Sequence, residues 1–343
     1  MRRNVLACVL LSLAAAPVLA QTETAMPAST SAAAATANTP IRDEAPVVVT
    51  GALPGPGMWK VFKGDHVMYV LGTVSPLPKR MEWISRDVEK ALAESDEVLL
   101  GSGVDIDADV GFFGKLTLLP SLIGIRKSPD GAELKDLVSP ASYARWLTLK
   151  QRYIGRDSDV EKWRPVFAAT RLYEEAIEDE GLVPSGIVAP VIDKAIKQHK
   201  IKRTEPRVKI KIKQPKAALK EFRGERLSDL DCFDKMLQNL ESDLVRMTER
   251  ANAWAVGDIE VLRNLPLGDQ GQSCWRAVTQ ASVARKNGLA DIENETRKVW
   301  LSAAESALDN NAVSFAVLPM SQLLKSDGYL AALQTKGYAV EAP

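Results

Sequence analysis

The chain has 343 residues, 46% of them hydrophobic, and its 44 Lys and Arg residues balance 44 Asp and Glu residues. This length allows one large domain or two small ones, and the zero formal charge argues against a protein that binds nucleic acid over its whole surface. Only two histidines, His66 and His199, are available for metal binding or proton transfer.

Residues 1–20 have the pattern of a secretory signal peptide. Arg2 and Arg3 form a basic start, residues 5–18 are apolar or small, and the tripeptide that ends at Ala20 fits a cleavage site before Gln21. A membrane anchor is the alternative, but this apolar run is shorter than the ~20 residues that span a bilayer, and no later segment is long and apolar enough. We therefore predict a periplasmic or secreted protein without a transmembrane segment after cleavage.

Residues 21–57 are rich in Ala, Thr, Ser and Pro and contain few large apolar side chains. Such a segment cannot bury enough apolar surface to offset the entropy lost on folding, so we predict a disordered tether. The folded domain is expected over residues 58–343.

The start of this domain alternates strand and helix patterns. Residues 59–62 and 67–73 are predicted to form two strands joined by a turn around Gly64. Helical spacing of apolar residues follows over 84–93, and residues 97–100 read as a buried strand. The order strand, helix, strand indicates an α/β sheet.

The middle of the chain is helical by pattern, and its end returns to strands. The predicted helices are 140–153, 160–180, 184–199, 227–255 and 272–309. A strand over 312–318, a helix over 322–334 and a final strand over 338–341 follow. The predicted fold class is therefore α/β, with a mixed sheet formed by N- and C-terminal strands and a large helical insertion between them.

Two cysteines remain after signal cleavage, Cys232 and Cys274. Export would place this pair in an oxidising compartment, which predicts a disulfide. Such a bridge would stabilise the fold by about 4 kcal/mol if unstrained. Two buried reduced thiols are the alternative.

A basic stretch covers residues 194–226, with thirteen Lys or Arg and three Glu. Within it, apolar residues alternate with Lys209, Lys211 and Lys213, so a strand here would place these three lysines on one face. One interpretation is a solvated strand whose lysines discourage edge-to-edge pairing. The other is a cationic face for an anionic envelope polymer, lipid headgroups or a protein partner.

The segment Met58–Leu77 (MWKVFKGDHVMYVLGTVSPL) resembles the opening of the TraB/GumN family, part of the TIKI/TraB-like superfamily. In that family a Trp-Lys-Val strand precedes a Tyr-x-Leu-Gly-Thr-Ile-His strand end. The close, residues 314–340, is similar to the family's Phe-Val-Ala-Val-Gly-Ala-Gly-His-Leu strand, short helix and Gly-Tyr-x-Val strand. Segments 88–100 and 254–258 extend the resemblance across residues 58–341.

The resemblance implies an α/β domain in which two Gly-x-x-His strand ends face one pocket. Family histidines with an acidic residue would hold a divalent ion that activates water. Here Ser75 and Ser321 stand at the two histidine positions, Leu318 replaces a glycine, and Gly101 stands where relatives carry an acid. Because a serine hydroxyl is a poor ligand for a divalent metal, we expect no metal, no cofactor and no family-type catalytic residue. The pocket candidates are Gly72, Thr73, Ser75, Gly101, Met320 and Ser321.

Other residues offer little replacement chemistry. Neither serine has a base or a nucleophile-elbow sequence beside it, and Ser75 before a proline reads as a turn residue. His66 is expected in a turn remote from the pocket, and His199 at a solvated helix end. Glu205 is either a pocket carboxylate or a surface acid among lysines.

Two further sets of residues leave alternatives open. Asp105, Asp107 and Asp109 alternate and could supply oxygen ligands to a metal, or they form a solvated acidic loop. The tryptophans of the predicted helices are expected in the core, although any exposed one could form an aromatic platform for carbohydrate. These are Trp146, Trp163, Trp254, Trp275 and Trp300.

The leading hypothesis is an exported, catalytically degenerate relative of the TraB/GumN proteins with a binding or scaffolding role in the cell envelope. The alternative is an active metal-dependent hydrolase that cleaves peptide or envelope polymer with residues the family does not use.

Overall fold

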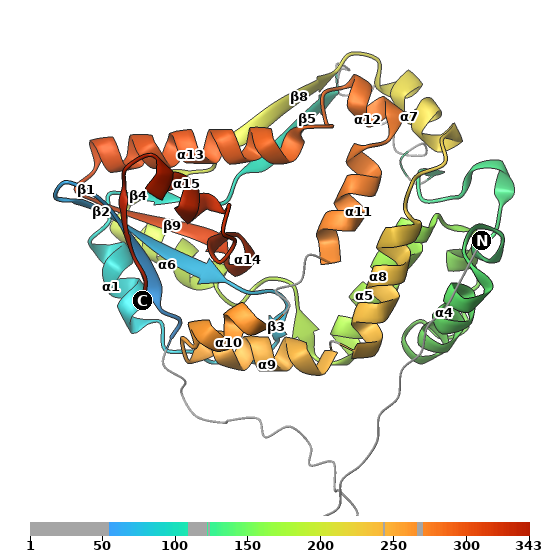
Figure 1. Cartoon of the computed structure of the whole chain (residues 1–343), viewed down its shortest axis with the longest axis horizontal. Coiled ribbons are helices and arrows are strands. Elements are labelled where there is room, and N and C mark those ends of the chain that lie inside the picture. The colour runs from blue at the N-terminus through green and yellow to red at the C-terminus, as the bar shows by residue number, and fades with distance from the viewer. Residues whose placement is uncertain (1–54, 109–121, 123, 243, 266–269) are drawn as a thin grey trace, which may run out of the picture. The chain divides into compact units, whose positions relative to one another are not determined.

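The structure is a computed structural model that describes residues 55–108, 122, 124–242, 244–265 and 270–343. Its described part contains a six-stranded mixed sheet in the order β10-β1-β2-β9-β4-β7 (Figure 1). The strands are β1 (Met58–Lys63), β2 (His66–Thr73), β4 (Glu97–Leu99), β7 (Lys202–Thr204), β9 (Val313–Pro319) and β10 (Ala339–Glu341). Early and late strands thus share one sheet, which confirms the predicted fold class.

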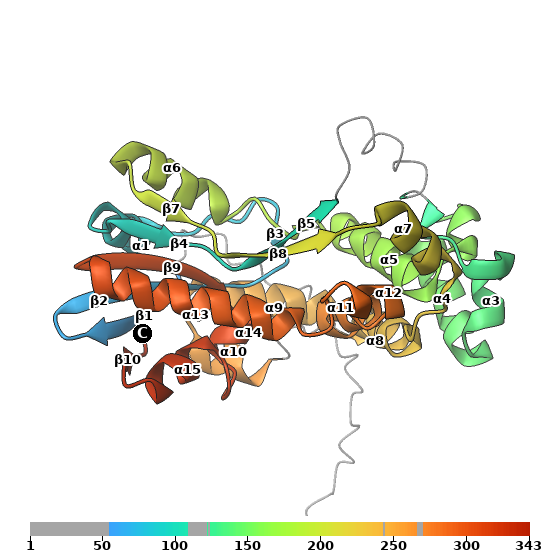
Figure 2. The same ribbon diagram turned by 90° about the horizontal axis from the view of Figure 1, so that it is seen from above.

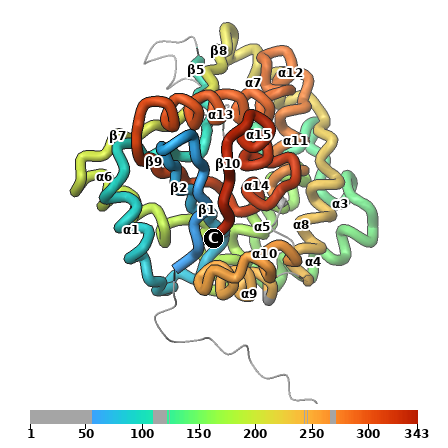
Figure 3. Tube along the Cα trace, turned by 60° about the vertical axis from the view of Figure 1, so that its left-hand side comes forward, coloured from blue at the N-terminus to red at the C-terminus, as the bar shows by residue number. Residues whose placement is uncertain are grey.

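The first two strands form the predicted hairpin. Lys63 pairs with His66 across a two-residue turn in which Gly64 has a φ of 61°, a conformation that glycine adopts without steric cost. Trp59 and Val61 on β1 are buried in the core. On the far side of β1, β10 adds an antiparallel edge, so the blue and red ends of the described chain lie side by side in Figure 3.

Four strands, β2, β9, β4 and β7, run parallel to one another. Helices α1 (Arg86–Ala93) and α6 (Ala189–His199) cover one face of the sheet, while α13 (Ile292–Asn310) crosses the other (Figures 1 and 2). Val88 and Leu92 of α1 and Trp300 of α13 are buried against these strands. With helices on both faces, the parallel strands are covered as such strands require.

A second hydrophobic cluster lies among α4 (Pro140–Tyr153), α5 (Pro165–Asp179) and α8 (Leu230–Ser242). Trp146 and Phe233 are fully buried there, with ring centroids 5.7 Å apart. Cys232 of α8 and Cys274 of α11 (Gln270–Thr279) lie at disulfide distance, with Cα atoms 4.8 Å apart, as the sequence predicts.

The buried Arg164 side chain links segments of this helical part through hydrogen bonds. Its guanidinium donates to the carbonyl of Lys127 and to two carbonyls of α7 (Pro215–Gly224), and it stacks 4.9 Å from the Phe222 ring. Nearby, Asp229 accepts the backbone N–H of Val166 at 2.9 Å, in the first turn of α5. Burial lowers the pKa of Arg164 and raises that of Asp229, as expected for charged groups removed from water.

Several predicted helices are shorter or divided in the structure. Residues 160–180 form α5 only from Pro165, because proline fixes the first helical turn. The stretch 227–255 divides into α8 and α9 (Leu244–Ala255), and 272–309 into α11, α12 (Ser282–Lys286) and α13. At the C-terminal end, α14 (Met320–Leu323) and α15 (Tyr329–Thr335) replace one helix. Between them Gly328 packs so closely that an added Cβ would lie 2.1 Å from the Gln322 carbonyl oxygen.

Strands outside the main sheet form two small ribbons. β3 (Leu77–Pro78) pairs with β6 (Leu182–Val183), and β5 (Gly103–Ala108) runs parallel to β8 (Arg207–Ile212). The remaining short elements are α3 (Leu134–Leu137), α10 (Ile259–Asn264) and 3-10 turns at Pro129–Gly131 and Asp159–Lys162. In the described ranges, every helix is too short or too polar to cross a bilayer.

Candidate functional site

The carboxyl ends of the parallel strands gather at one edge of the main sheet. β2 ends at Thr73, β9 at Pro319 and β4 at Leu99. Ligands of open α/β sheets bind outside this edge, because the loops that leave the strands diverge there. Around it, the described residues line three cavities, which we name the central, side and polar cavities.

The central cavity has a volume of about 710 Å³ and lies at the ends of β2 and β9. Ser75 follows β2, Ser321 follows β9, and both line this cavity. Its described lining residues are Thr73, Val74, Ser75, Val166, Phe167, Thr170, Tyr173, Met236, Arg250, Gly271, Cys274, Trp275, Val278, Pro319, Met320 and Ser321. The two serines thus face one space from opposite ends of the chain.

Three hydroxyl groups of the central cavity donate their protons to backbone carbonyls. Ser75 Oγ donates to the Pro184 oxygen at 3.0 Å, Thr73 Oγ1 to the Leu318 oxygen at 3.3 Å, and Thr170 Oγ1 within α5 at 2.8 Å. A carbonyl oxygen is not a base that can activate a nucleophile. Toward the cavity these hydroxyls therefore present oxygen lone pairs, which accept hydrogen bonds from a ligand.

Arg250 of α9 is the one charged side chain among the described lining residues of the central cavity, and it is only 4% exposed. Arg250 and Tyr173 each also have an interaction partner within the protein. The sequence contains a signal that points to Arg250. It lies at helical spacing from the fully buried Met247 and Trp254, so a charge falls on the apolar face of α9.

Trp275 is the exposed aromatic residue of this site. Its side chain, on α11, lines the central cavity and is 42% exposed. In contrast, Trp146, Trp254 and Trp300 are fully buried and serve the core, and Trp163 is partly buried. Periodicity could not separate Trp275 from the others, because all five lie in helical patterns.

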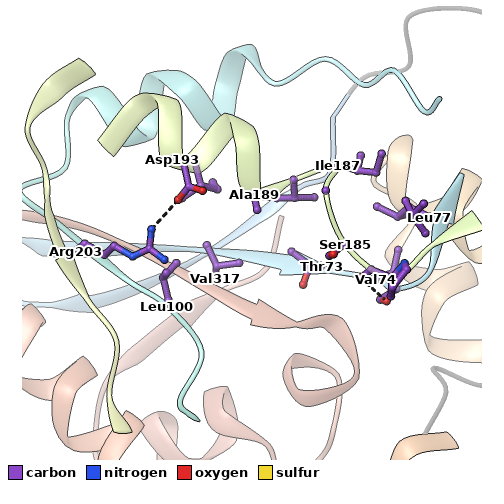
Figure 4. Close-up of a pocket in the computed structure, with 16 residues that line it drawn as sticks. Thr73, Val74, Leu77, Leu100, Ser185, Ile187, Ala189, Asp193, Arg203 and Val317 are labelled. Atoms are coloured by element: carbon purple, nitrogen blue, oxygen red, sulfur yellow. Dashed lines mark hydrogen bonds and ion pairs between the residues drawn. The ribbon is translucent and has the colours of Figure 1, made fainter. Parts of the chain in front are cut away.

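The side cavity, of about 270 Å³, shares Thr73, Val74 and Ser75 with the central cavity and is otherwise lined by different residues (Figure 4). Its walls are mostly apolar, and Asp193 of α6 faces Arg203 of β7 at one end, joined by a 2.8 Å ion pair. The hydrogen bond from Arg203 to Glu205 raises the pKa of Arg203. Glu205 is exposed and lines none of the three cavities, so it is a surface acid rather than a pocket carboxylate.

Gly101 belongs to the polar cavity, of about 450 Å³, and not to the central one. Helix α11 separates the two, since Gln272 and Arg276 line the polar cavity whereas Trp275 and Val278 line the central cavity. The pocket candidates that share the central cavity are Thr73, Ser75, Met320 and Ser321.

Gly72 lines none of these three cavities but shapes the wall of the central one. An added Cβ would lie 2.5 Å from Met320 Cε and 3.0 Å from Leu323 Cδ1. Its carbonyl accepts a hydrogen bond from Trp254 Nε1 at 2.7 Å. Met320 therefore occupies the space that a side chain at position 72 would need.

The two histidines lie outside the three cavities. His66 begins β2, at the end of the strand opposite Thr73, and its Nδ1 lies 2.6 Å from the Leu308 carbonyl oxygen. His199 ends α6 and is exposed.

The alternating lysines of β8 face aspartates of β5. Lys209 pairs in register with Asp105, and Lys211 with Asp107. The predicted acidic loop is therefore wrong for residues 103–108, which form a strand, and Asp109 lies outside the described residues. In the described part of the chain, no group of three or more His, Cys, Asp or Glu side chains lies close enough together to hold a metal ion.

The family model described as TraB/PrgY/gumN matches residues 57–342. The chain belongs to the TraB/PrgY/gumN family. Neither a curated protein nor a solved structure matches it.

The divalent metal implied by the TraB/GumN resemblance does not fit the central cavity. A divalent ion is held by imidazole, carboxylate or thiolate groups. The described lining instead offers Ser75 and Ser321 at the motif positions, a guanidinium cation at Arg250, and Cys274 paired with Cys232. In this TraB/PrgY/gumN protein, the described residues of the strand-end cavity thus do not form a donor set for a divalent metal.

Proposed function

We propose that this TraB/PrgY/gumN protein binds a ligand in the central cavity and does not hydrolyse it. One observation carries the proposal: the strand-end positions hold Ser75 and Ser321, and the Ser75 hydroxyl donates to the Pro184 carbonyl. Neither a metal-bound water nor an activated serine can be built from these groups. A cavity of about 710 Å³ with an exposed tryptophan and a buried arginine remains suited to binding.

The proposed place of action is the cell envelope. Residues 1–20 have the composition of a cleaved signal, and residues 21–57 that of a tether. The pairing of Cys232 with Cys274 suits an oxidising compartment. These features support an exported, catalytically degenerate protein with a binding or scaffolding role.

The mature protein, purified and supplied with Zn²⁺, Mn²⁺ or Mg²⁺, tests the proposal through metal content and peptide cleavage. We expect no stoichiometric metal and no turnover above the protein-free rate. Turnover that a chelator abolishes would instead support the active metal-dependent hydrolase.

Restoring the motif histidines tests the geometry of the cavity. The double variant Ser75→His/Ser321→His should gain affinity for Zn²⁺ because both positions line one cavity. Ser306→His/Ser326→His is the matched control, since both serines are exposed and lie outside that cavity. Equal Zn²⁺ affinity of the two double variants, measured by calorimetry, would contradict a shared strand-end site.

A further inference from the structure

We infer that the ligand of the central cavity is an acidic saccharide, a short chain of sugar units that carries carboxylate groups. The inference rests on the proposed binding role and names the class of ligand. It draws on three features of the cavity wall: a buried cation, hydroxyl acceptors and an exposed indole.

The buried cation is Arg250. At 4% exposure its charge is poorly solvated, so an anionic ligand group in the cavity interacts with it more strongly than at the surface. The guanidinium is planar and can donate two parallel hydrogen bonds to a carboxylate. Arg250 already interacts with a group of the protein, and its guanidinium carries five N–H donors through which it can also bind a ligand carboxylate.

The hydroxyl acceptors are Thr73, Ser75 and Thr170. Each donates its own proton to a backbone carbonyl, so each can only accept from a ligand. Sugar hydroxyls supply such donors along the whole ligand. The oxygens of a phosphate group accept hydrogen bonds, and these three hydroxyls have no proton left to donate to them. The same arrangement therefore disfavours phosphate.

The exposed indole is that of Trp275. A flat aromatic face carries partial negative charge and attracts the weakly positive C–H groups of a sugar ring. At 42% exposure, this side chain lines the cavity while remaining open to solvent, and Phe167 and Met236 extend the apolar wall. A ring can therefore stack there while its carboxylate reaches inward to the arginine.

An extended peptide fits this cavity less well. Peptides bind sheets by adding a strand to a free edge. At the central cavity the ends of β2 and β9 pair with each other, while the pairing of β2 with β1 stops at Leu71 and that of β9 with β4 stops at Ala316. The edges left over, residues 72–73 and 317–319, are too short for an added strand, and the Gly72 carbonyl already accepts from Trp254 Nε1.

Isothermal calorimetry on the mature chain tests the inference with trimers of galacturonate, glucuronate and mannuronate. Their methyl esters, which keep the ring and lose the charge, serve as matched ligands. We expect at least one acidic trimer to bind, and its ester to bind at least tenfold more weakly.

Two variants assign the contacts. Arg250→Gln should weaken the acidic trimer at least tenfold and remove its advantage over the ester, whereas Trp275→Ala should weaken both ligands by a similar factor. Arg145→Gln and Leu147→Ala, on α4 and outside the cavity, are the controls and should bind as the unaltered protein does. If Arg250→Gln fails to fold, Thr170→Val replaces it, because this near-isosteric change removes an acceptor and no charge, and it should weaken acid and ester equally.

The outcomes separate this inference from the proposed function. Binding of none of the acidic trimers, equal affinity for acid and ester, or an unaffected Trp275→Ala variant would overturn the acidic saccharide. If trialanine binds instead, with an affinity that Trp275→Ala lowers, the ligand class is wrong while the binding role stands. Cleavage of a bound trimer would keep the ligand class and overturn the non-hydrolytic role.

Discussion

Gly72 controls the wall of the central cavity although it does not line it. Met320 occupies the space beside this glycine, and its own side chain, which is almost completely buried, forms part of the cavity lining. A side chain at position 72 would push against the flexible end of Met320. The effect would pass from the sheet to the binding site through one contact.

We expect Gly72→Ala to destabilise the protein by about 1 kcal/mol, since the methionine can shift only partly in a packed core. Gly101→Ala is the matched control, because an added Cβ there meets nothing within 4 Å, and it should change stability by less than ~0.5 kcal/mol. Urea unfolding of both variants measures the difference. Equal midpoints would show that the Met320 contact is unimportant.

The Glu97 side chain makes the stability of the folded protein depend on pH. Burial at the start of β4 raises its pKa, but hydrogen bonds from Thr204, Lys202 and Asn311 outweigh burial, and the net pKa is lowered. A carboxyl with a lowered pKa in the folded state stabilises the protein above its ordinary value of 4.5, and this stabilisation is lost as the pH falls through the folded value.

Glu97→Gln should therefore cost about 2 kcal/mol of unfolding free energy at pH 7, and less as the pH is lowered below 4.5. Urea unfolding at a series of pH values from 7 to about 3 measures the two curves. Glu94→Gln, at a neighbouring exposed position, should show the same change of unfolding free energy with pH as the unaltered protein. A constant loss for Glu97→Gln at all pH values would contradict the assigned role of its charge.

At the scale of elements, α11 forms the partition between the central and polar cavities. It holds Trp275 toward one and Arg276 toward the other, and Cys274 joins it to α8. The covalent link therefore fixes a wall of the proposed binding site as well as the helical cluster.

Cys232→Ser/Cys274→Ser should lower the free energy of unfolding by about 2–4 kcal/mol, because the bridge closes a loop of 42 residues. Urea unfolding with and without dithiothreitol measures this loss. The reductant should destabilise the unaltered protein and leave the double variant unchanged. Insensitivity of both proteins to reductant would argue for two free thiols.

The β5–β8 ribbon is the second element with a testable consequence. Asp105 forms an ion pair with Arg207, and Asp107 lies in register with Lys211, so the two acids offset part of the positive charge of Arg207, Lys209 and Lys211. We expect weak binding to phosphatidylglycerol vesicles, and a gain for Asp105→Asn/Asp107→Asn, since each cation that loses its acidic neighbour contributes about 1 kcal/mol near an anionic surface. Cosedimentation at 50 and 300 mM NaCl should show that high salt removes the gain. Strong, salt-sensitive binding of the unaltered protein would restore the cationic-face interpretation.

Local pattern predicted some elements and missed others for identifiable reasons. The hairpin of β1 and β2 and the strand β9 follow from buried apolar residues bounded by turns. In contrast, β7 is the polar tripeptide Lys202–Thr204, which is a strand because it pairs with β4. Pairing is a long-range property, so neither β7 nor the partner of β8 could be read from local sequence.

The sequence likewise predicted some residues of the site and missed others. The motif positions led to Ser75 and Ser321, and the structure places both at one cavity. Gly101, expected beside them, lies across α11 because the helix that separates the cavities comes from a distant part of the sequence. The position of Trp275 depends on the packing of α11, which helical spacing alone does not give, whereas Arg250 stands out in the sequence as a charge on the apolar face of α9.

For the whole molecule, the predicted export defines the first residue of the mature protein. Mass spectrometry of the protein recovered from a bacterial periplasm should show Gln21 as its N-terminus, because the residues before it fit a cleavage site. Ala20→Asp should block processing and leave residues 1–20 attached. A Met1 N-terminus in the cytoplasmic fraction would exclude the signal.

The position of β9 in the sheet has a consequence for how the chain reaches its fold. This strand lies between β2 and β4, and its contact from Thr73 to Leu318 joins residues 245 positions apart. Closing so long a loop is slow, and the centre of the sheet stays open until the segment after residue 312 has been synthesised. Folding of the sheet is thereby delayed until most of the chain has been synthesised. It also means that proteolytic loss of this late segment would remove the middle of the sheet along with Ser321.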